Sequence, residues 1–410
     1  MIHVPLITPF AEDGSVATAA LEELAHEVLA DGAGGLVALG TTGEPAGLAD
    51  EERAEVAAVV GRVCREHGAR FTVGVSASGT ERAAAALAAL ETLPVLPDAA
   101  LVTVPPFTRP GEAGVVAHFR ALAAAGPVPL LVYHVPRRTG QPLSAAALRE
   151  LAALPGIAGV KYAVDVIDAQ TVELLGDLPA GFEVLAGDDV LAPALFALGA
   201  HGGILASAHL ATAQWVRLAA RGDGPGGDGT GSGESAGRAA TGGAPVPGPG
   251  APRGIPALGH AAPTGGSALG RAAGHAASGG VPGPGHAASA GGSALGRAAG
   301  HAASGRGPVL RHAAPGADPA LGHAAPDGAV ALGHRLSALA AALFREPNPA
   351  VIKAVLHAQG RIPTPDVRLP LLPAGREAFE DALGALDGLA GLAGLDGPAA
   401  SGPARVRLVT

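Results

Sequence analysis

The sequence predicts an α/β protein whose main architecture is a closed (β/α)8 TIM barrel, followed by additional C-terminal helices. Eight short apolar runs are each bounded by turn residues, and most precede a segment with helical periodicity. Near-continuous apolar strands joined by helical crossovers are typical of a parallel sheet that is covered on both faces. Eight such units in about 300 residues favour closure into a barrel, and an open doubly wound sheet is the alternative.

The predicted strands alternate with predicted helices along the chain. The strands are 3–8, 35–40, 71–75, 99–105, 129–134, 158–162, 183–187 and 202–207. Helical segments follow the first two strands at 17–31 and 50–68, and Asp50 is the expected N-cap of the second. The helical segments that follow the last strand are 212–223, 333–344, 348–360 and 376–391.

A segment of different composition interrupts this pattern. Residues 222–328 contain 31 of the 63 glycines and no Phe, Tyr or Trp, so they cannot bury enough apolar surface to offset the entropy of ordering. We expect a disordered insert with internal repeats, because GGSALGRAAGHAASG occurs at 265–279 and again at 291–305. Its six histidines lack the close pairing of structural zinc ligands, so we expect repeat expansion rather than a metal site. The expected parts of the chain are the barrel at 1–221, the insert at 222–328, completing helices at 329–395 and a tail at 396–410.

Composition excludes several classes of function. The single cysteine, Cys64, cannot form an internal disulfide, and the first ten residues lack the features of a secretory signal, so we expect a cytoplasmic protein. No uncharged apolar run reaches the ~18 to 20 residues of a membrane span, and a net charge of −9 offers no attraction to phosphate backbones. We therefore expect neither a membrane protein nor a nucleic-acid-binding protein.

One lysine stands out among the polar residues at the predicted strand ends, where barrel active sites form. Only two of the 27 basic residues are lysines, and one of them, Lys161, lies near the end of the strand at 158–162. An amine that is removed from water has a lowered pKa and can attack a carbonyl carbon when neutral, which arginine cannot do. The other interpretation is a lysine that reaches solvent or forms an ion pair.

Three other features lie at the same predicted barrel mouth. Tyr133 ends a buried strand, and its hydroxyl either moves protons near an amine or is incidental to core packing. The turn Thr41-Thr42-Gly43 offers backbone N–H groups and two hydroxyls to a carboxylate, although a plain strand-to-helix turn uses the same residues. Arg138 follows the strand of Tyr133 and either pairs with a second carboxylate or faces water.

Several segments in order along the chain carry a family resemblance. They are PLITPFAEDGSV, GLVALGTTGEPAGLADEER, PDAALVTVPPFTRPGE, LLVYHVPRRTG, GIAGVKYA, LAGDD, LGAHGGILAS, EPNPAVIKAVLHAQG and VRLPLLP. Across residues 1–221 and 329–375 the chain resembles the dihydrodipicolinate synthase/N-acetylneuraminate lyase family of class I aldolases. The resemblance implies a TIM barrel, assembled as a homo-oligomer (a dimer or a tetramer), that forms a Schiff base between Lys161 and pyruvate or another 2-oxo acid.

The resemblance also implies roles for the other residues. Tyr133 would shuttle protons, and Thr41 and Thr42 would hold the carboxylate of the 2-oxo acid. The backbone at Gly187 and Ile204 would line the pocket. The resemblance implies neither a metal ion nor a cofactor, because the lysine imine itself serves as the electron sink.

Within the family, Arg138 resembles the arginine with which synthases bind the carboxylate of aspartate semialdehyde. Three positions depart from the synthase pattern. Phe107 stands where synthases have the tyrosine of a proton relay, His134 replaces a usual asparagine, and Tyr162 replaces a usual glutamate. We expect a structural role for His134. The segment after GTTGE lacks the histidines of lysine-regulated synthases, which argues against feedback inhibition by lysine.

These observations predict a Schiff-base-forming lyase that condenses pyruvate or a related 2-oxo acid with an aldehyde such as aspartate semialdehyde, or catalyses the reverse cleavage. The change at Phe107 leaves open a 2-keto-3-deoxy sugar-acid aldolase or dehydratase that uses the same imine. A catalytically silent barrel that senses a 2-oxo acid or serves as a scaffold is a third hypothesis, against which Lys161 and Tyr133 argue. The expected partners are small 2-oxo acid and aldehyde substrates.

Overall fold

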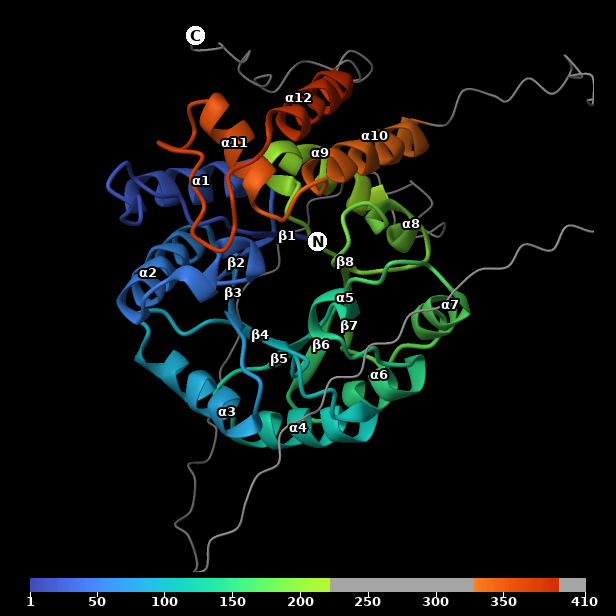
Figure 1. The fold of residues 1–410 in the computed structure, drawn as a ribbon. Coiled ribbons are helices and arrows are strands. Elements are labelled where there is room, and N and C mark those ends of the chain that lie inside the picture. Colours follow the sequence, from blue (N-terminus) through green and yellow to red (C-terminus); the bar gives the residue numbers. More distant parts are fainter. Residues whose placement is uncertain (222–327, 391–410) are drawn as a thin grey trace, which may run out of the picture. The chain divides into compact units, whose positions relative to one another are not determined.

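A closed barrel of eight parallel strands forms the centre of the protein (Figure 1), in a computed structural model that describes residues 1–221 and 328–390. The strands are β1 (Ile2–Pro5), β2 (Gly35–Ala38), β3 (Arg70–Val75), β4 (Ala99–Thr103), β5 (Leu130–His134), β6 (Ile157–Tyr162), β7 (Glu183–Ala186) and β8 (Gly202–Ile204). Strand β1 pairs in parallel with both β2 and β8, so the sheet has no edge. The predicted barrel is therefore confirmed, and the open sheet is excluded.

All eight predicted strands are present, but most end earlier than predicted. The first was expected to reach residue 8 and ends at Pro5, and the last was expected to reach residue 207 and ends at Ile204. One more backbone bond to a neighbouring strand follows each of these ends, from Leu6 and from Leu205. Farther along, the hydroxyl of Thr8 donates to the Gly43 carbonyl, and the backbone N–H of Ser207 donates to the Asp189 carboxylate. Apolar runs therefore continue into the loops of the barrel mouth, where periodicity alone cannot separate strand from loop.

Helices surround the barrel (Figure 1). Those of the first segment are α1 (Thr18–Ala30), α2 (Asp50–His67), α3 (Thr80–Ala88), α4 (Gly111–Ala125), α5 (Pro136–Thr139), α6 (Ala145–Ala152), α7 (Ala169–Gly176), α8 (Ala192–Ala197) and α9 (Ala208–Arg221). The prediction of Asp50 as an N-cap is wrong by one residue, because Ala49 precedes the helix and Asp50 opens it. The Ala49 N–H donates to the Glu52 carboxylate at 2.8 Å, so an acidic side chain inside the first turn takes over the capping.

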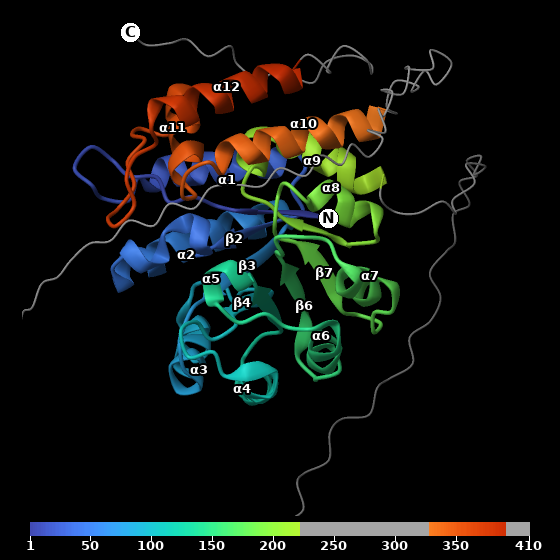
Figure 2. The ribbon, with the colours of Figure 1, turned by 45° about the vertical axis from the view of Figure 1, so that its right-hand side comes forward.

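Three further helices follow the undescribed stretch: α10 (Gly328–Leu343), α11 (Ala350–Ala358) and α12 (Arg376–Ala390). They gather on one side of the barrel, beside α1 and α9 (Figure 2). Helix α10 begins at Gly328, the last residue of the predicted insert and five residues before the helix predicted at 333–344. The rest of the predicted insert, with its repeats and histidines, lies outside the described residues, as do residues 391–410.

Two apolar layers build the core. One lies between the strands and the helices, and it includes buried residues from α9 to α12 such as Trp215, Leu336 and Ile352. The other fills the barrel interior with side chains from alternate strand positions, among them Val37, Leu131, Leu185 and Ile204. Tyr133 belongs to this inner layer. No helix within the two described segments is long and apolar enough to cross a membrane.

Candidate active site

A pocket at the C-terminal ends of the strands, which we call the lysine pocket after Lys161, brings most of the predicted site residues together. Six of the seven line it: Thr41, Thr42, Tyr133, Arg138, Lys161 and Gly187. Ile204, whose backbone was expected to line the pocket, is not among the lining residues, and its side chain is buried in the barrel interior. Ala206 is the pocket residue that follows β8. The strand ends thus converge as the barrel architecture requires.

Lys161 lies on β6, and the neighbouring strand gives its side chain room to reach the pocket. A Cβ atom at Gly187 would come within 2.6 Å of the Lys161 Cγ and 2.8 Å of its Cε. Only glycine permits this close approach. The Lys161 Nζ then lies 5.5 Å from the centroid of the Tyr133 ring, and it forms no hydrogen bond or ion pair with the described residues. The amine is therefore available to a ligand.

The surroundings of the Lys161 amine favour its neutral form. Burial lowers the pKa of Lys161 to about 8, and the nearby guanidinium groups of Arg138 and Arg137 act in the same direction. The carboxylate of Asp189 opposes this shift because it attracts the ammonium form. A substantial neutral fraction near neutral pH is what a nucleophilic amine needs.

Asp189 is a residue of this pocket that the sequence argument did not assign to the site. It is buried, and one of its carboxylate oxygens accepts hydrogen bonds from both the N–H and the hydroxyl of Ser207, each at 2.7 Å. The Ser207 hydroxyl in turn accepts a hydrogen bond from the Trp215 indole at 2.9 Å. Burial raises the pKa of Asp189 to about 6. Its position two residues after a predicted strand was a signal that could have found it.

Tyr133 points its hydroxyl to the pocket rather than into the core. The ring is 5% exposed, and the hydroxyl lies 3.0 Å from the Thr41 Oγ1. The two hydroxyls form a short relay between the lysine side of the pocket and the Thr41–Gly43 turn. Such a pair can pass a proton in either direction.

The Thr41–Gly43 segment forms a single 3₁₀ turn directly after β2. The opening N–H groups of such a turn have no partner within it, so they can point at an anion. The Thr42 hydroxyl accepts a hydrogen bond from the Asn348 side chain at 2.9 Å. Asn348 and Phe344 come from the C-terminal helical region and complete the lining of the pocket. Sequence reasoning did not assign them, because no periodicity links them to a turn some 300 residues earlier.

Arg138 lies in the one-turn helix α5, immediately after β5. Its guanidinium is exposed and forms no ion pair with the described part of the chain, whereas the adjacent Arg137 pairs with Asp188 at 3.7 Å. Arg138 also lines a second cavity of about 860 Å³, which shares Thr41, Tyr133 and Asn348 with the lysine pocket. An anionic ligand in this cavity can therefore meet the Arg138 charge.

None of the three positions that depart from the synthase pattern lines the lysine pocket. His134 is buried, and its Nε2 accepts a hydrogen bond from the Leu143 N–H at 3.1 Å, so its expected structural role is confirmed. Burial lowers the pKa of His134 to about 4, which keeps the ring neutral. The Tyr162 hydroxyl forms a hydrogen bond with the hydroxyl of Thr171 on α7 at 3.0 Å. Phe107 is 86% exposed and does not line the lysine pocket.

Metal-ligating side chains do not cluster in the described ranges 1–221 and 328–390. No three His, Cys, Asp or Glu residues there form a group that could hold a metal ion.

Comparisons with known proteins identify the family of this chain. The model of the dihydrodipicolinate synthetase family matches residues 1–223. The 4-hydroxy-tetrahydrodipicolinate synthase of Neisseria meningitidis serogroup C is 37% identical over 224 residues, which are 54% of this chain and 75% of that relative. The enzyme of the same name from Limosilactobacillus fermentum is 35% identical over 206 residues, which are 50% of this chain and 64% of that relative, slightly less than two thirds of its length.

A solved structure extends the comparison to the C-terminal helices. The chloride-inhibited dihydrodipicolinate synthase from Acinetobacter baumannii, complexed with pyruvate, is 25% identical and has a TM-score of 0.64. The match covers 94% of this chain and 97% of that one. The expected family is thereby confirmed. The chain belongs to the dihydrodipicolinate synthetase family.

Proposed function

We propose that the protein is a Schiff-base-forming lyase that condenses pyruvate, or a related 2-oxo acid, with an aldehyde such as aspartate semialdehyde, or catalyses the reverse cleavage. The observation that carries the proposal is the Lys161 amine, whose pKa is lowered to about 8 and which faces a pocket with the Tyr133–Thr41 hydroxyl pair. The names of the curated relatives support the synthase reaction. The covalent imine requires no further cofactor.

The pocket residues supply each step of such a reaction. Neutral Lys161 attacks the 2-oxo carbon, and the carbinolamine loses water as Tyr133 and Thr41 move protons. The Thr41–Thr42 turn holds the carboxylate of the 2-oxo acid. The protonated imine then withdraws electrons, so that C3 loses a proton to the Tyr133–Thr41 hydroxyl pair. The enamine adds to the aldehyde carbon, and the same pair returns a proton to the aldehyde oxygen, which becomes a hydroxyl. Hydrolysis of the resulting imine returns the free amine.

Arg138 and the adjoining cavity support an acidic aldehyde as the second substrate. The guanidinium has no protein partner in the described segments and is shaped for a bidentate bond to a carboxylate. The second candidate function is a 2-keto-3-deoxy sugar-acid aldolase or dehydratase that uses the same imine. The observation that favours it is Phe107, which brings no hydroxyl to the lysine pocket and is exposed.

We also propose that the protein is a cytoplasmic homo-oligomer, a dimer or a tetramer. Phe107, Leu369 and Leu372 are 86%, 79% and 71% exposed, and contact with another copy would remove these apolar side chains from water. The single cysteine is buried, which is consistent with a reducing compartment.

Trapping with borohydride tests the proposed function. Reduction of the purified protein in the presence of pyruvate should give a stable adduct, and peptide mass mapping should place it on Lys161. A panel of longer 2-oxo acids then ranks the synthase against the sugar-acid reaction. If no 2-oxo acid is trapped, the Schiff-base proposal is wrong and the barrel has another role.

The pH dependence of imine formation should follow the pKa of Lys161. Only the neutral amine attacks, so the rate of adduct formation should rise with pH and level off above about 8. The Asp189 carboxylate stabilises the ammonium form of Lys161, so Asp189→Asn should move the inflection to lower pH, and the amide oxygen can still accept from Ser207. The Arg138 guanidinium destabilises the ammonium form, so Arg138→Met should move the inflection to higher pH.

Opposite shifts in the two variants would identify Lys161 as the titrating group. The other lysine, Lys353, also has a pKa lowered to about 8, but the charges that act on it are those of Glu44, Asp366 and Arg368. Rapid quenching into borohydride across neutral and alkaline pH gives the profile. An inflection that stays at the same pH in both variants would contradict the assignment.

A further inference from the structure

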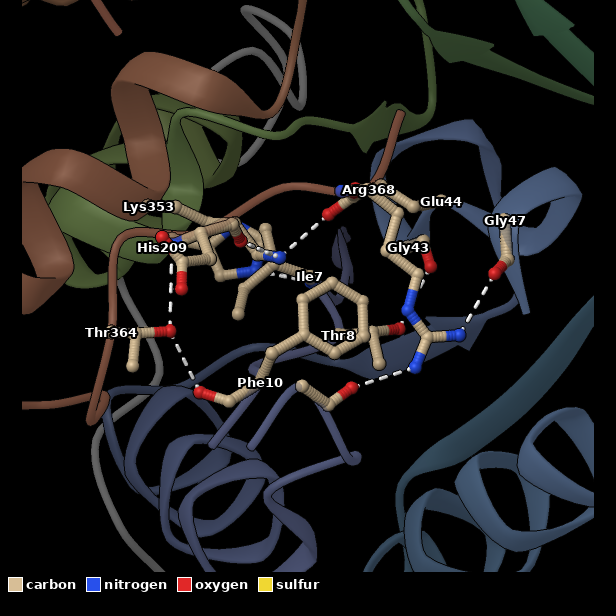
Figure 3. A network of polar contacts seen from close by, with 12 residues as sticks. Ile7, Thr8, Phe10, Gly43, Glu44, Gly47, His209, Lys353, Thr364 and Arg368 are labelled. Atoms are coloured by element: carbon tan, nitrogen blue, oxygen red, sulfur yellow. Dashed lines mark hydrogen bonds and ion pairs between the residues drawn. The ribbon is translucent and has the colours of Figure 1, made fainter. Parts of the chain in front are cut away.

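The second lysine of the chain lies in a buried polar network (Figure 3) near the lysine pocket. Lys353, on α11, is fully buried and forms an ion pair with Glu44 at 2.6 Å. Its amine also donates to the Asp366 carbonyl at 2.7 Å and lies 4.0 Å from the centroid of the Phe10 ring. The amine is thus fully engaged by the protein and is not free to react with a substrate.

Glu44 directly follows the Thr41–Gly43 turn and occupies an unusual backbone conformation. Its φ angle is 55°, in the left-handed region that favours glycine and is uncommon for other residues. A glutamate at this position is explained by its side chain, because both carboxylate oxygens are used. One oxygen accepts a hydrogen bond from the Lys353 amine, and the other accepts one from the backbone N–H of Arg368 at 2.8 Å.

The same turn is attached to the rest of the protein at its other residues. The Thr8 hydroxyl donates to the Gly43 carbonyl at 2.7 Å, and Asn348 donates to the Thr42 hydroxyl. Arg368 forms a bidentate ion pair with Glu52 and donates to the Gly47 carbonyl, so it ties the following segment to the start of α2. The C-terminal segment therefore holds the turn both at Thr42 and at Glu44.

Stability alone is a weak explanation for this ion pair. Removing two charges from water costs several kcal/mol each, and apolar replacements of a buried pair are often neutral or stabilising. The pair does fix the position of Glu44, the residue that directly follows the Thr41–Gly43 turn.

We infer that Lys353 is a positioning residue, which acts through Glu44 to hold the N–H groups and hydroxyls of Thr41 and Thr42 where the carboxylate of the 2-oxo acid binds. This inference rests on the proposed function. It assigns α11 an indirect part in recognition of the 2-oxo acid, because no residue of α11 lines the lysine pocket.

The double variant Glu44→Gln/Lys353→Met tests the inference. Because it removes both charges together, it leaves no unpaired buried charge, and the protein should still fold. Its KM for pyruvate should rise about tenfold or more, as expected when a charge-assisted hydrogen bond to the carboxylate is misplaced. Its KM for the aldehyde should change less than about threefold, because Arg138 is untouched. A purely structural role would not separate the two constants.

Two further variants make the result decisive. Thr8→Val removes a neutral attachment of the same turn, and it should raise the pyruvate KM in the same selective way even if the double variant fails to fold. Arg361→Met is the matched control: Arg361 lies on the same C-terminal segment but bonds to Glu27 of α1 and to the His209 carbonyl of α9 rather than to the turn, so the pyruvate KM should not change.

The outcomes separate the two proposals. Wild-type protein that is not trapped by borohydride with pyruvate would refute the proposed function itself. Wild-type protein that is trapped, together with a folded double variant or Thr8→Val variant of unchanged pyruvate KM, would refute only the positioning role. An equal rise in Arg361→Met would also refute it, because the effect would then be a general loosening of the C-terminal segment.

Discussion

Lys161→Met is expected to abolish the borohydride adduct and to lower kcat on the order of 10³-fold or more, because loss of a covalent nucleophile leaves only binding and electrostatic contributions. Methionine is one atom shorter than lysine and keeps an unbranched apolar stem, so it can follow the same path beside Gly187. The measurement combines turnover with pyruvate and an aldehyde, trapping followed by peptide mapping, and thermal unfolding to verify the fold.

Lys161→Arg is the matched control for charge. Arginine keeps the positive charge near Asp189 but cannot supply a neutral amine, so this variant should be as inactive as the methionine variant. Activity in Lys161→Arg would mean that the charge of Lys161 matters and its nucleophilicity does not. An adduct that persists in either variant would place the imine on another amine.

Tyr133→Phe should lower kcat by about 10²-fold to 10³-fold, the range expected for the loss of a group that transfers protons. The ring is 5% exposed and packs in the inner layer of the barrel, so phenylalanine keeps the apolar contacts and removes only the hydroxyl beside Thr41. The adduct on Lys161 should still form, but more slowly. Rapid-quench trapping separates this slower imine formation from any later step.

Thr41→Val provides the comparison for Tyr133. It breaks the hydrogen bond between the two hydroxyls but leaves the phenol in place, so kcat should fall less than in Tyr133→Phe. If Tyr133→Phe kept wild-type turnover, the hydroxyl would be incidental to packing and water would move the protons. If the adduct were lost entirely in Tyr133→Phe, the phenol would be essential for imine formation rather than an accelerator of it.

Much of the fold could be predicted because local patterns report it. A parallel strand buried on both faces must be apolar throughout, and a crossover helix must be amphipathic, so both patterns are visible in the chain. The barrel rule then placed Lys161, Tyr133 and Arg138 at one mouth without any knowledge of contacts. Ile204 is the exception, because whether a residue near a strand end faces the barrel interior or the pocket depends on register and twist.

The sequence by itself determined the order of the strands and helices, the side of the barrel where chemistry occurs, and the residue types that carry it. Only the tertiary structure decided what surrounds those residues. Asn348 meets Thr42 across 306 positions of sequence, and Lys353 meets Glu44 across 309. The physical reason is that periodicity reflects the environment of neighbours in the chain, whereas a pKa, a buried ion pair or a hydrogen bond depends on atoms that only the folded chain brings within a few ångströms.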